Sequence, residues 1–343
     1  MKIAVLCGGL SNERDVSITS GSCVARALRE KGHKVVLVDL FLGYKGEFED
    51  ANELFEAEQA DFKYSVSEEA PDLKKLLEES NGIRIGENVI EICKAADICY
   101  LALHGEEGEN GKLQATLDMY GIKYTGSGYI GSALAMNKEL SKIQFKANGI
   151  PTPPGIILED GVKKPYEDVG FPCVVKPCSG GSSVGTSVVY SREEYEAAVD
   201  LAFKYEAHVL VEKFVKGREL TVGIMDGKAM PVIEIIPKNG FYDYKNKYQA
   251  GLTEEICPAP ISKEDTDRVQ RLAEKVMEAL MVDVYCRADF LMDETDGELY
   301  CLEANTLPGM TPTSLIPQMA AEQGMDFGEV CEKIIAVSME KYK

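Results

Sequence analysis

The sequence predicts a multi-domain α/β protein, and three features of its 343 residues support this prediction. In the N-terminal third, short apolar runs alternate with segments of helical periodicity, which is typical of a parallel sheet. After a proline-rich stretch at 150–155, apolar runs follow one another through short turns, which is typical of antiparallel strands. The chain is longer than one domain of about 150 residues, so we expect two or three domains.

The N-terminal third begins with a strand, a turn and a helix. Ile3–Leu6 is apolar and leads into a Gly-Gly-Leu-Ser turn, and Val24, Ala27 and Leu28 share one side of the helix that follows. Ligands of a parallel sheet bind where the carboxyl ends of its strands meet, so the loops after these strands are candidate sites. The strands expected here cover 3–6, 34–40, 98–103 and 122–125.

The rest of the chain is expected to form mainly antiparallel strands covered by helices. Val269, Ala273 and Val276 recur at helical spacing after a Ser262 cap signal, which predicts a helix at 265–280. A second helix is predicted at 192–204. The expected strands cover 173–176, 187–190, 208–212, 220–225, 230–236, 285–292 and 299–303.

Charge and composition exclude several classes of partner. The 57 acidic residues outnumber the 37 basic ones, and the formal charge of −20 repels nucleic acid and anionic membranes. A small phosphorylated anion is still compatible, because local lysines and backbone amides outweigh a distant net charge. Segment 41–92 holds 14 acidic and five basic residues, and we interpret it as a surface insertion.

The chain lacks the features of a secreted or membrane-spanning protein. Its first residues have no long apolar stretch of the signal-peptide type, and no run of about 18 apolar residues occurs. Its ten cysteines form no Cys-x-x-Cys pair and mostly lie in apolar runs, which indicates buried, reduced thiols. We therefore expect a cytoplasmic protein.

One segment combines a lysine with a run of glycines and hydroxyls. In Lys176–Thr186, small residues would let backbone N–H groups surround phosphate oxygens, and Lys176 would add a positive charge. The lysine precedes the glycines, so the segment is not a Walker A loop. Taken alone, the segment is equally compatible with an ordinary hairpin turn.

Two of the predicted strands carry polar side chains on one face. Arg287 and Asp289 alternate along one strand, and Glu303 and Asn305 alternate along the other. If the strands pair, two carboxylates and a carboxamide lie together, and hard oxygen ligands of this kind suit Mg²⁺. The alternative is a solvated sheet face with a surface ion pair.

Three loops after predicted strands are weaker candidates. Glu13 opens a helix after the first strand and could bind an ammonium group, although a helix cap with an exposed charge explains it equally well. His104 begins a glycine-rich loop at the ligand-binding edge of the sheet and is a candidate for substrate contact. Segment 241–248 is polar and aromatic, and it is either a lid over a site or an exposed loop.

In this order, the segments resemble the D-alanine–D-alanine ligases of the ATP-grasp superfamily over nearly the whole chain, excepting 41–92. The resemblance implies an ATP-grasp fold with an N-terminal Rossmann-like domain. Its domains would cover 1–127, with the acidic insertion at 41–92, then 128–213 and 214–343, and the protein would be a homodimer. The most specific blocks are GGLSNERDVSITSG, ALHGEEGENGKLQ, YTGSGYIGSALAMNK, VVKPCSGGSSVG, LVEKF, FYDYKNKY and LEANTLPGMTPTSL.

The resemblance also implies a reaction. ATP would phosphorylate the carboxylate of one D-alanine, and the amine of a second would attack the acyl phosphate to give the dipeptide used in peptidoglycan synthesis. Two Mg²⁺ (or Mn²⁺) ions would bridge the ATP phosphates, held by Asp289, Glu303 and Asn305. The residues implied for ATP binding are Lys138, Lys176, Ser182, Ser183, Glu212, Lys213, Val215, Glu219 and Lys247.

For the amino-acid substrates, the resemblance implies two subsites. Glu13 would pair with the ammonium group of the first D-alanine, with His104 nearby. Arg287 and the backbone N–H of Gly309 would stabilise the acyl phosphate and the tetrahedral oxyanion. The carboxylate of the second D-alanine would be received by Ser314, beside Leu315.

The resemblance implies two roles for Tyr248, in closing the lid loop and in selecting the second substrate. Ser182 and Tyr248 would join Glu13 in a hydrogen-bonded set that holds the lid loop over the site. In similar ligases, histidine at the Tyr248 position accompanies D-lactate, and phenylalanine there with arginine at the Leu315 position accompanies D-serine. Tyr248 and Leu315 therefore favour D-alanine. Segment 41–92 instead resembles that of the longer VanG-type D-Ala–D-Ser ligases, so such a ligase is the alternative function. A second alternative is a non-catalytic nucleotide-binding homologue.

Overall fold

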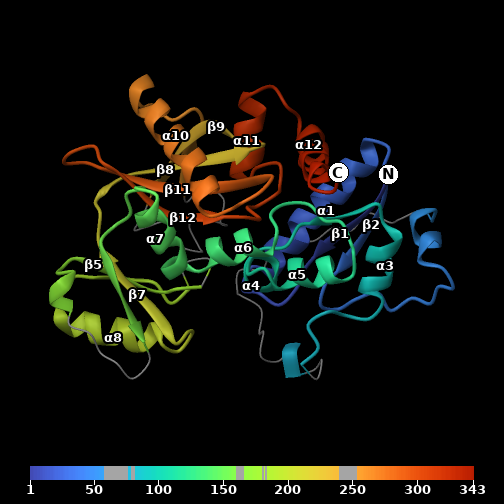
Figure 1. The fold of residues 1–343 in the computed structure, drawn as a ribbon, viewed down its shortest axis with the longest axis horizontal. Coiled ribbons are helices and arrows are strands. Elements are labelled where there is room, and N and C mark those ends of the chain that lie inside the picture. Colours follow the sequence, from blue (N-terminus) through green and yellow to red (C-terminus); the bar gives the residue numbers. More distant parts are fainter. Residues whose placement is uncertain (58–75, 79–81, 160–165, 180, 182–183, 239–252) are drawn as a thin grey trace.

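The computed structural model consists of three sheets and the helices that cover them (Figure 1). It describes residues 1–57, 76–78, 82–159, 166–179, 181, 184–238 and 253–343. The two ends of the chain lie close together, beside the N-terminal sheet. Within the described residues, no helix is both long and apolar enough to cross a membrane.

The N-terminal sheet is parallel, as the alternation of strands and helices predicts. β1 (Lys2–Cys7) lies between β2 (Lys34–Asp39) and β3 (Ile98–Leu101). β1 is buried from its second residue onward, as expected for a parallel strand covered on both faces. Helix α1 (Arg14–Glu30) packs on β1 and β2, and α3 (Val89–Ala95) precedes β3.

The prediction of a strand at 122–125 is wrong. Only Tyr124 forms a bridge, to Cys99 of β3, and Gly126 turns the chain away with a φ of +85°. The single bridge leaves the segment as an edge contact, in which the Thr125 hydroxyl accepts a hydrogen bond from the Leu101 N–H at 3.0 Å. Four helices precede or follow this segment along the chain: α4 (Glu106–Glu109), α5 (Lys112–Met119), α6 (Tyr129–Met136) and α7 (Lys138–Ala147).

The largest sheet is five-stranded, antiparallel and ordered β10-β9-β8-β11-β12. Helices α10 (Lys263–Ala279) and α11 (Leu315–Glu322) pack on it, whereas α12 (Phe327–Glu340) returns to pack on α1. The predicted helix at 265–280 and the strands from 285 and 299 are thereby confirmed. The strands are β8 (Gly217–Met225), β9 (Lys228–Pro237), β10 (Thr253–Ile256), β11 (Tyr285–Asp293) and β12 (Leu299–Asn305).

The third sheet is smaller and also antiparallel, in the order β4-β7-β5-β6. Helix α8 (Arg192–Ala202) covers one face of it and closes a separate small core. Figure 1 shows this unit at the lower left, apart from the N-terminal sheet. Its strands are β4 (Gly155–Glu159), β5 (Cys173–Pro177), β6 (Ser187–Val189) and β7 (His208–Lys213), and the short helix η2 (Tyr166–Asp168) precedes β5.

The acidic segment 41–92 is joined to the N-terminal core at both ends. The short helix η1 (Ala51–Phe55) contacts β2 and buries Leu54 and Phe55, and Val89 and Ile92 of α3 are buried in the same core. Residues 58–75 and 79–81 lie outside the described residues. All ten cysteines lie in the described part of the chain and are unpaired, as expected, and eight of them are buried.

Gly21 allows α1 to lie directly on β1. An added Cβ would lie 2.5 Å from the Cys7 Cβ and 3.2 Å from the Leu37 Cδ1. Gly21→Ala should therefore force the helix outward and lower the free energy of unfolding by about 1–3 kcal/mol. Urea unfolding checks this, with the exposed Arg26→Ala of the same helix as the control. Equal stability of Gly21→Ala and wild type would show that the helix and strand accommodate the methyl group.

Candidate active site

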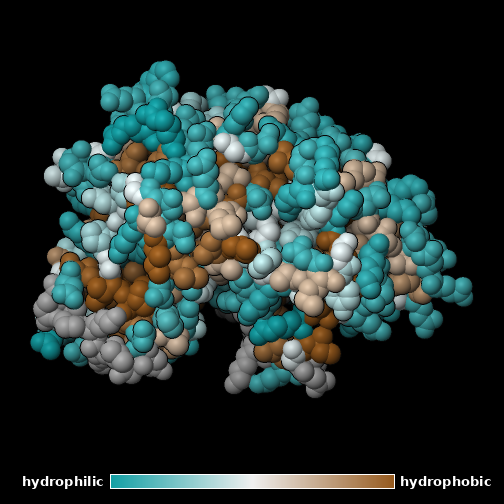
Figure 2. All heavy atoms as spheres, viewed as in Figure 1, coloured by the Kyte–Doolittle hydropathy of each residue, from teal (hydrophilic) through white to brown (hydrophobic). Residues whose placement is uncertain are grey.

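Two adjoining cavities lie where the three sheets meet. The inter-sheet cavity, of about 510 Å³, lies between the four-stranded and the five-stranded sheets. The carboxyl-edge cavity, of about 360 Å³, lies between the carboxyl ends of the parallel strands and the loop after β12. Lys138 and Glu303 line both cavities, so a ligand could extend from one into the other. Figure 2 shows the outline of the molecule indented between the small sheet and the N-terminal sheet.

β11 and β12 pair so that their polar residues face one another. Asp289 lies opposite Glu303, and Arg287 lies opposite Asn305, which is the arrangement that the alternation predicts. The register then shifts, because Phe290 pairs with Cys301 and leaves Leu302 as an extra residue. A bulge of this kind redirects side chains, and here the successive residues Leu302 and Glu303 both line the inter-sheet cavity.

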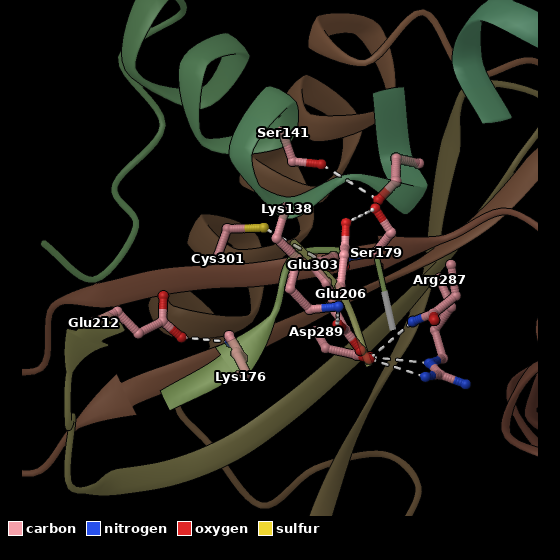
Figure 3. Close-up of polar contacts among 12 residues, drawn as sticks. Lys138, Ser141, Lys176, Ser179, Glu206, Glu212, Arg287, Asp289, Cys301 and Glu303 are labelled. Atoms are coloured by element: carbon pink, nitrogen blue, oxygen red, sulfur yellow. Dashed lines mark hydrogen bonds and ion pairs between the residues drawn. The ribbon is translucent and has the colours of Figure 1, made fainter. Parts of the chain in front are cut away.

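Asp289 is the centre of a hydrogen-bonded group. Arg287 donates from Nε and Nη2 to its two oxygens, both at 2.9 Å, and Asn305 Nδ2 donates at 3.0 Å (Figure 3). The Thr221 hydroxyl of neighbouring β8 donates to Asp289 Oδ1 at 2.6 Å. Asp289 is buried, and these four hydrogen bonds compensate for the loss of water around its charge.

Lys138 brings a positive charge to the junction of the cavities. Its Nζ lies 3.1 Å from Glu303 Oε2, and its backbone N–H donates to the Cys178 carbonyl at 2.8 Å. The second contact joins the start of α7 to the glycine-rich run after β5. That run is also anchored at Ser179, whose N–H and hydroxyl donate to Glu206 at 2.6 and 2.9 Å (Figure 3).

The inter-sheet cavity has apolar walls and a charged end. Lys176 of β5 contacts Glu212 of β7 at 2.5 Å (Figure 3), and their side chains are 12% and 3% exposed. Burial alone would lower the pKa of Lys176, but the Glu212 and Glu303 carboxylates raise it, so Lys176 is cationic. A planar, partly apolar ligand with an anionic end matches this shape and charge. The apolar lining residues include Val174, Val188, Phe214, Val215, Leu291 and Leu302.

The predicted ATP residues that the structure describes all line the inter-sheet cavity. They are Lys138, Lys176, Glu212, Lys213, Val215 and Glu219. Glu212 is buried, which alone would raise its pKa, but the Lys176 and Lys142 ammonium groups hold the pKa below its usual value. Four predicted residues lie outside the described part of the chain and stay predictions: Ser182, Ser183, Lys247 and Tyr248.

Glu13 and the neighbouring loops form one wall of the carboxyl-edge cavity. Glu13 opens α1, and the cavity is lined by its side chain together with His104 and Gly181. Added Cβ atoms on Gly105 and on Gly181 would each lie 3.1 Å from Glu13 Oε2. Gly181, in the glycine-rich run after β5, therefore lies beside Glu13, although 168 positions separate the two residues in sequence.

His104 is held by the protein on both ring nitrogens. Nδ1 lies 2.8 Å from the Leu307 carbonyl, and Nε2 lies 2.9 Å from the Ser20 hydroxyl. Burial lowers the pKa of His104, so the ring is neutral at pH 7. The sequence predicts a substrate contact for His104, and the structure adds that its ring links α1 to the loop after β12.

The other wall is the loop from Asn305 to the start of α11. The Ser314 hydroxyl accepts a hydrogen bond from the Thr311 N–H at 3.0 Å and caps the turn. Gly309 lies against it, since an added Cβ would be 3.0 Å from Ser314 Oγ. Ser314, Leu315 and Gly309 all line the carboxyl-edge cavity, as does Arg287. The predicted substrate residues that the structure describes are therefore together.

The donor set at β11 and β12 fits Mg²⁺ only with help from a ligand. Among the described residues, no group of three or more His, Cys, Asp or Glu side chains is arranged to hold a metal. Asp289 and Glu303 supply two carboxylates, and Asn305 supplies a carboxamide oxygen. Mg²⁺ usually binds to one or two carboxylates and completes its shell with water and phosphate oxygens, so the set suits a metal–phosphate complex.

Three residues of the site carry no recognisable signal in the sequence. Glu109 accepts hydrogen bonds from the N–H groups of Gly105 and Leu307, at 2.8 and 3.0 Å, and thereby connects two loops. Lys142 contacts Glu212 at 2.7 Å, and Thr221 contacts Asp289. The acidic loop 104–114 and the lysine-rich α7 could have suggested the first two, but neither spacing indicates which side chain turns inward.

Comparisons with known proteins agree along the whole chain. Residues 2–127 match the family model described as D-ala D-ala ligase N-terminus, and residues 145–336 match D-ala D-ala ligase C-terminus. The chain is 42% identical to the D-alanine--D-alanine ligase of Pediococcus pentosaceus, covering all of this chain and 99% of that protein. It is 41% identical to the enzyme of the same name from Lacticaseibacillus casei, and that match covers all of this chain and 97% of the other protein.

The fold comparison leads to the same family. The crystal structure of the D-alanine--D-alanine ligase from Bacillus anthracis complexed with ATP superimposes with a TM-score of 0.76 at 31% identity. The match covers 99% of this chain and 97% of that one. This confirms the predicted mixed α/β fold of the ATP-grasp type.

Glu109 should make stability depend on pH in a defined window. Burial, and then the nearby Glu13, raise the pKa of Glu109 from 4.5 to about 7. Between these values the folded protein binds more protons than the unfolded chain, so the ionisation of Glu109 lowers stability as pH rises. The variant Glu109→Gln is the reference, because a glutamine side chain does not titrate. The free energy of unfolding of wild type minus that of the variant should fall by on the order of 3 kcal/mol from pH 4.5 to pH 7.5, measured by urea unfolding. A difference that stays flat would contradict the burial of a titrating carboxyl.

Proposed function

The chain belongs to the D-alanine–D-alanine ligase family, and from that premise we propose that it joins two D-alanine molecules in an ATP-dependent reaction. The observation that carries this proposal is the meeting of two cavities at Lys138 and Glu303. One cavity suits a nucleotide, and the other suits two small zwitterions. A phosphoryl group can therefore pass from one to the other. The dipeptide product would enter peptidoglycan synthesis.

The first step transfers the γ-phosphoryl group of ATP. A carboxylate oxygen of the first D-alanine attacks the γ-phosphorus, the bond to the β-phosphate oxygen breaks, and ADP leaves. Glu13 binds the ammonium group of this D-alanine and so orients its carboxylate toward the junction of the cavities. Lys138 and Lys176 neutralise the phosphates, and both lie at the charged end of the inter-sheet cavity.

The second step forms the peptide bond. The amine of the second D-alanine, after losing a proton, attacks the carbonyl carbon of the acyl phosphate, and the tetrahedral intermediate expels inorganic phosphate. Arg287 and Gly309 both line the carboxyl-edge cavity, where the Arg287 guanidinium and the Gly309 N–H can stabilise the oxyanion. Ser314 and Leu315 receive the carboxylate of the second substrate, while Ser182 and Tyr248 are proposed to hold the lid closed.

We propose that Asp289, Glu303 and Asn305 hold two Mg²⁺ or Mn²⁺ ions together with ATP. When bound, such ions would neutralise the phosphates and polarise the transferred group. Asp289 is paired with Arg287 at 2.9 Å. A new partner for Asp289 would leave more of the Arg287 charge for the acyl phosphate.

We further propose a cytoplasmic homodimer with domains at 1–127, 128–213 and 214–343. The first boundary coincides with the end of the N-terminal family region at residue 127, and the third sheet forms its own small core. A band of hydrophobic side chains crosses the face shown in Figure 2, over α6 and α7, where Ile130, Leu140 and Ile143 are exposed. A second copy of the chain would cover such a band.

The second substrate should be D-alanine. Leu315 is apolar and lines the acceptor subsite, so it offers no partner for the hydroxyl of D-serine. With D-alanine alone, ATP should release phosphate, and when D-serine or D-lactate is present together with D-alanine, the dipeptide of D-alanine should stay the main product. Mass spectrometry of the products identifies the dipeptide. Preferred incorporation of D-serine would assign the chain to the D-Ala–D-Ser ligases, and no turnover with any acceptor would support a non-catalytic homologue.

Arg287→Met tests the proposed catalytic role of Arg287. Losing one stabilising donor in the transition state should lower kcat by about 10²–10³-fold, while ATP affinity, measured by calorimetry, changes little. Arg268→Met, on the outer surface of α10 and paired with Asp265, is the matched control. Turnover of Arg287→Met within a few-fold of wild type would exclude the role.

A further inference from the structure

We infer that Lys142 is a positioning residue for ATP, which keeps the charge of Lys176 available to the phosphates by sharing the Glu212 carboxylate. This inference rests on the proposed function, because it concerns the same nucleotide cavity. Lys142 lies on α7, one turn after Lys138, and does not itself line the inter-sheet cavity. Among the partners of Lys142, Glu212 and Pro153 line the cavity, and only Glu212 carries a charge.

The contacts of Lys142 use its whole ammonium group. Nζ donates to Glu212 Oε2 at 2.7 Å, to the Thr152 hydroxyl at 2.8 Å and to the Pro153 carbonyl at 2.7 Å. A lysine ammonium has three N–H donors, so each has a partner. Lys142 is buried, and its contacts join three segments: α7, the proline-rich connection and β7.

Glu212 lies between two ammonium groups. Its Oε1 contacts Lys176 and its Oε2 contacts Lys142, at 2.5 and 2.7 Å. One carboxylate thus faces two positive charges, and the three side chains together carry a net charge of +1. If Lys142 were neutral, Glu212 would cancel the charge of Lys176, and the phosphate end of the cavity would lose its attraction for an anion.

Burial makes this arrangement effective. The side chains of Glu212 and Lys142 are 3% and 7% exposed, so water screens their charges weakly. Lys142 also fixes the orientation of the carboxylate, because Oε2 is directed away from the cavity and Oε1 toward Lys176. A buried charge without its partner is costly, so loss of Lys142 should also pull Glu212 more tightly onto Lys176.

The experiment measures Mg²⁺–ATP binding by calorimetry and steady-state kinetics on the full chain. Lys142→Met and Lys142→Gln both remove the charge, and the second keeps a hydrogen-bond donor should the first fold poorly. Lys142→Arg keeps the charge. Lys146→Met, exposed on the same helix, is the control, and Lys176→Ala sets the scale for removing the cavity-lining charge itself.

We expect Lys142→Met and Lys142→Gln to raise the Kd and KM for ATP roughly 10- to 30-fold, the effect of one charge acting over several ångströms at an effective dielectric constant of about 20. KM for D-alanine should change less than twofold, and Lys142→Arg should regain most of the ATP affinity. A purely structural role would instead affect both substrates alike.

Two results would overturn the inference. One is ATP affinity in folded Lys142→Gln equal to that of wild type. The other is an equal loss in folded Lys142→Arg and Lys142→Gln, which would show that charge is not what matters. If wild type itself failed to bind Mg²⁺–ATP, the proposed function would fail first, and this inference with it. Circular dichroism and urea unfolding establish which variants are folded.

Discussion

The pairing of β11 with β12 is the constraint on which the rest of the site depends. Side chains alternate along a strand, so a slip by one residue would send Asp289 or Glu303 into the opposite face of the sheet. The observed register instead places Asp289 opposite Glu303 and Arg287 opposite Asn305. Lys138 from α7 then contacts Glu303, which connects the parallel sheet and its helices to the phosphate end of the cleft.

Three cations that the structure describes at the phosphate end each have a carboxylate partner. Arg287 contacts Asp289, Lys138 contacts Glu303, and Lys176 contacts Glu212 (Figure 3). These pairs compensate charges that are largely removed from water. They also explain how a chain with a net charge of −20 can attract a polyanion: the cations are local and preorganised, and binding exchanges one set of anionic partners for another.

The sequence patterns predicted helices and strands better than they predicted individual side-chain contacts. The alternation of Arg287 with Asp289 predicted a polar sheet face, because period two is a property of any strand. The bulge at Leu302 has no such pattern in the sequence, because an extra residue can be recognised only when the pairing with the partner strand is known. Segment 122–125 reads as a strand locally, yet only Tyr124 pairs. Lys142 and Glu109 were missed for a similar reason: burial of a charged side chain depends on partners far away in sequence. Tyr248 and Ser182 lie outside the described residues.

The return of α12 to α1 has a consequence for how the protein is made. The core of the N-terminal sheet includes Ile3 and Val5, but also Val330, Ile334 and Ile335 from the last helix. During synthesis the parallel sheet emerges from the ribosome long before these residues do. Its apolar face therefore stays incompletely covered until α12 has been made, so an early part of the protein is completed only late in synthesis.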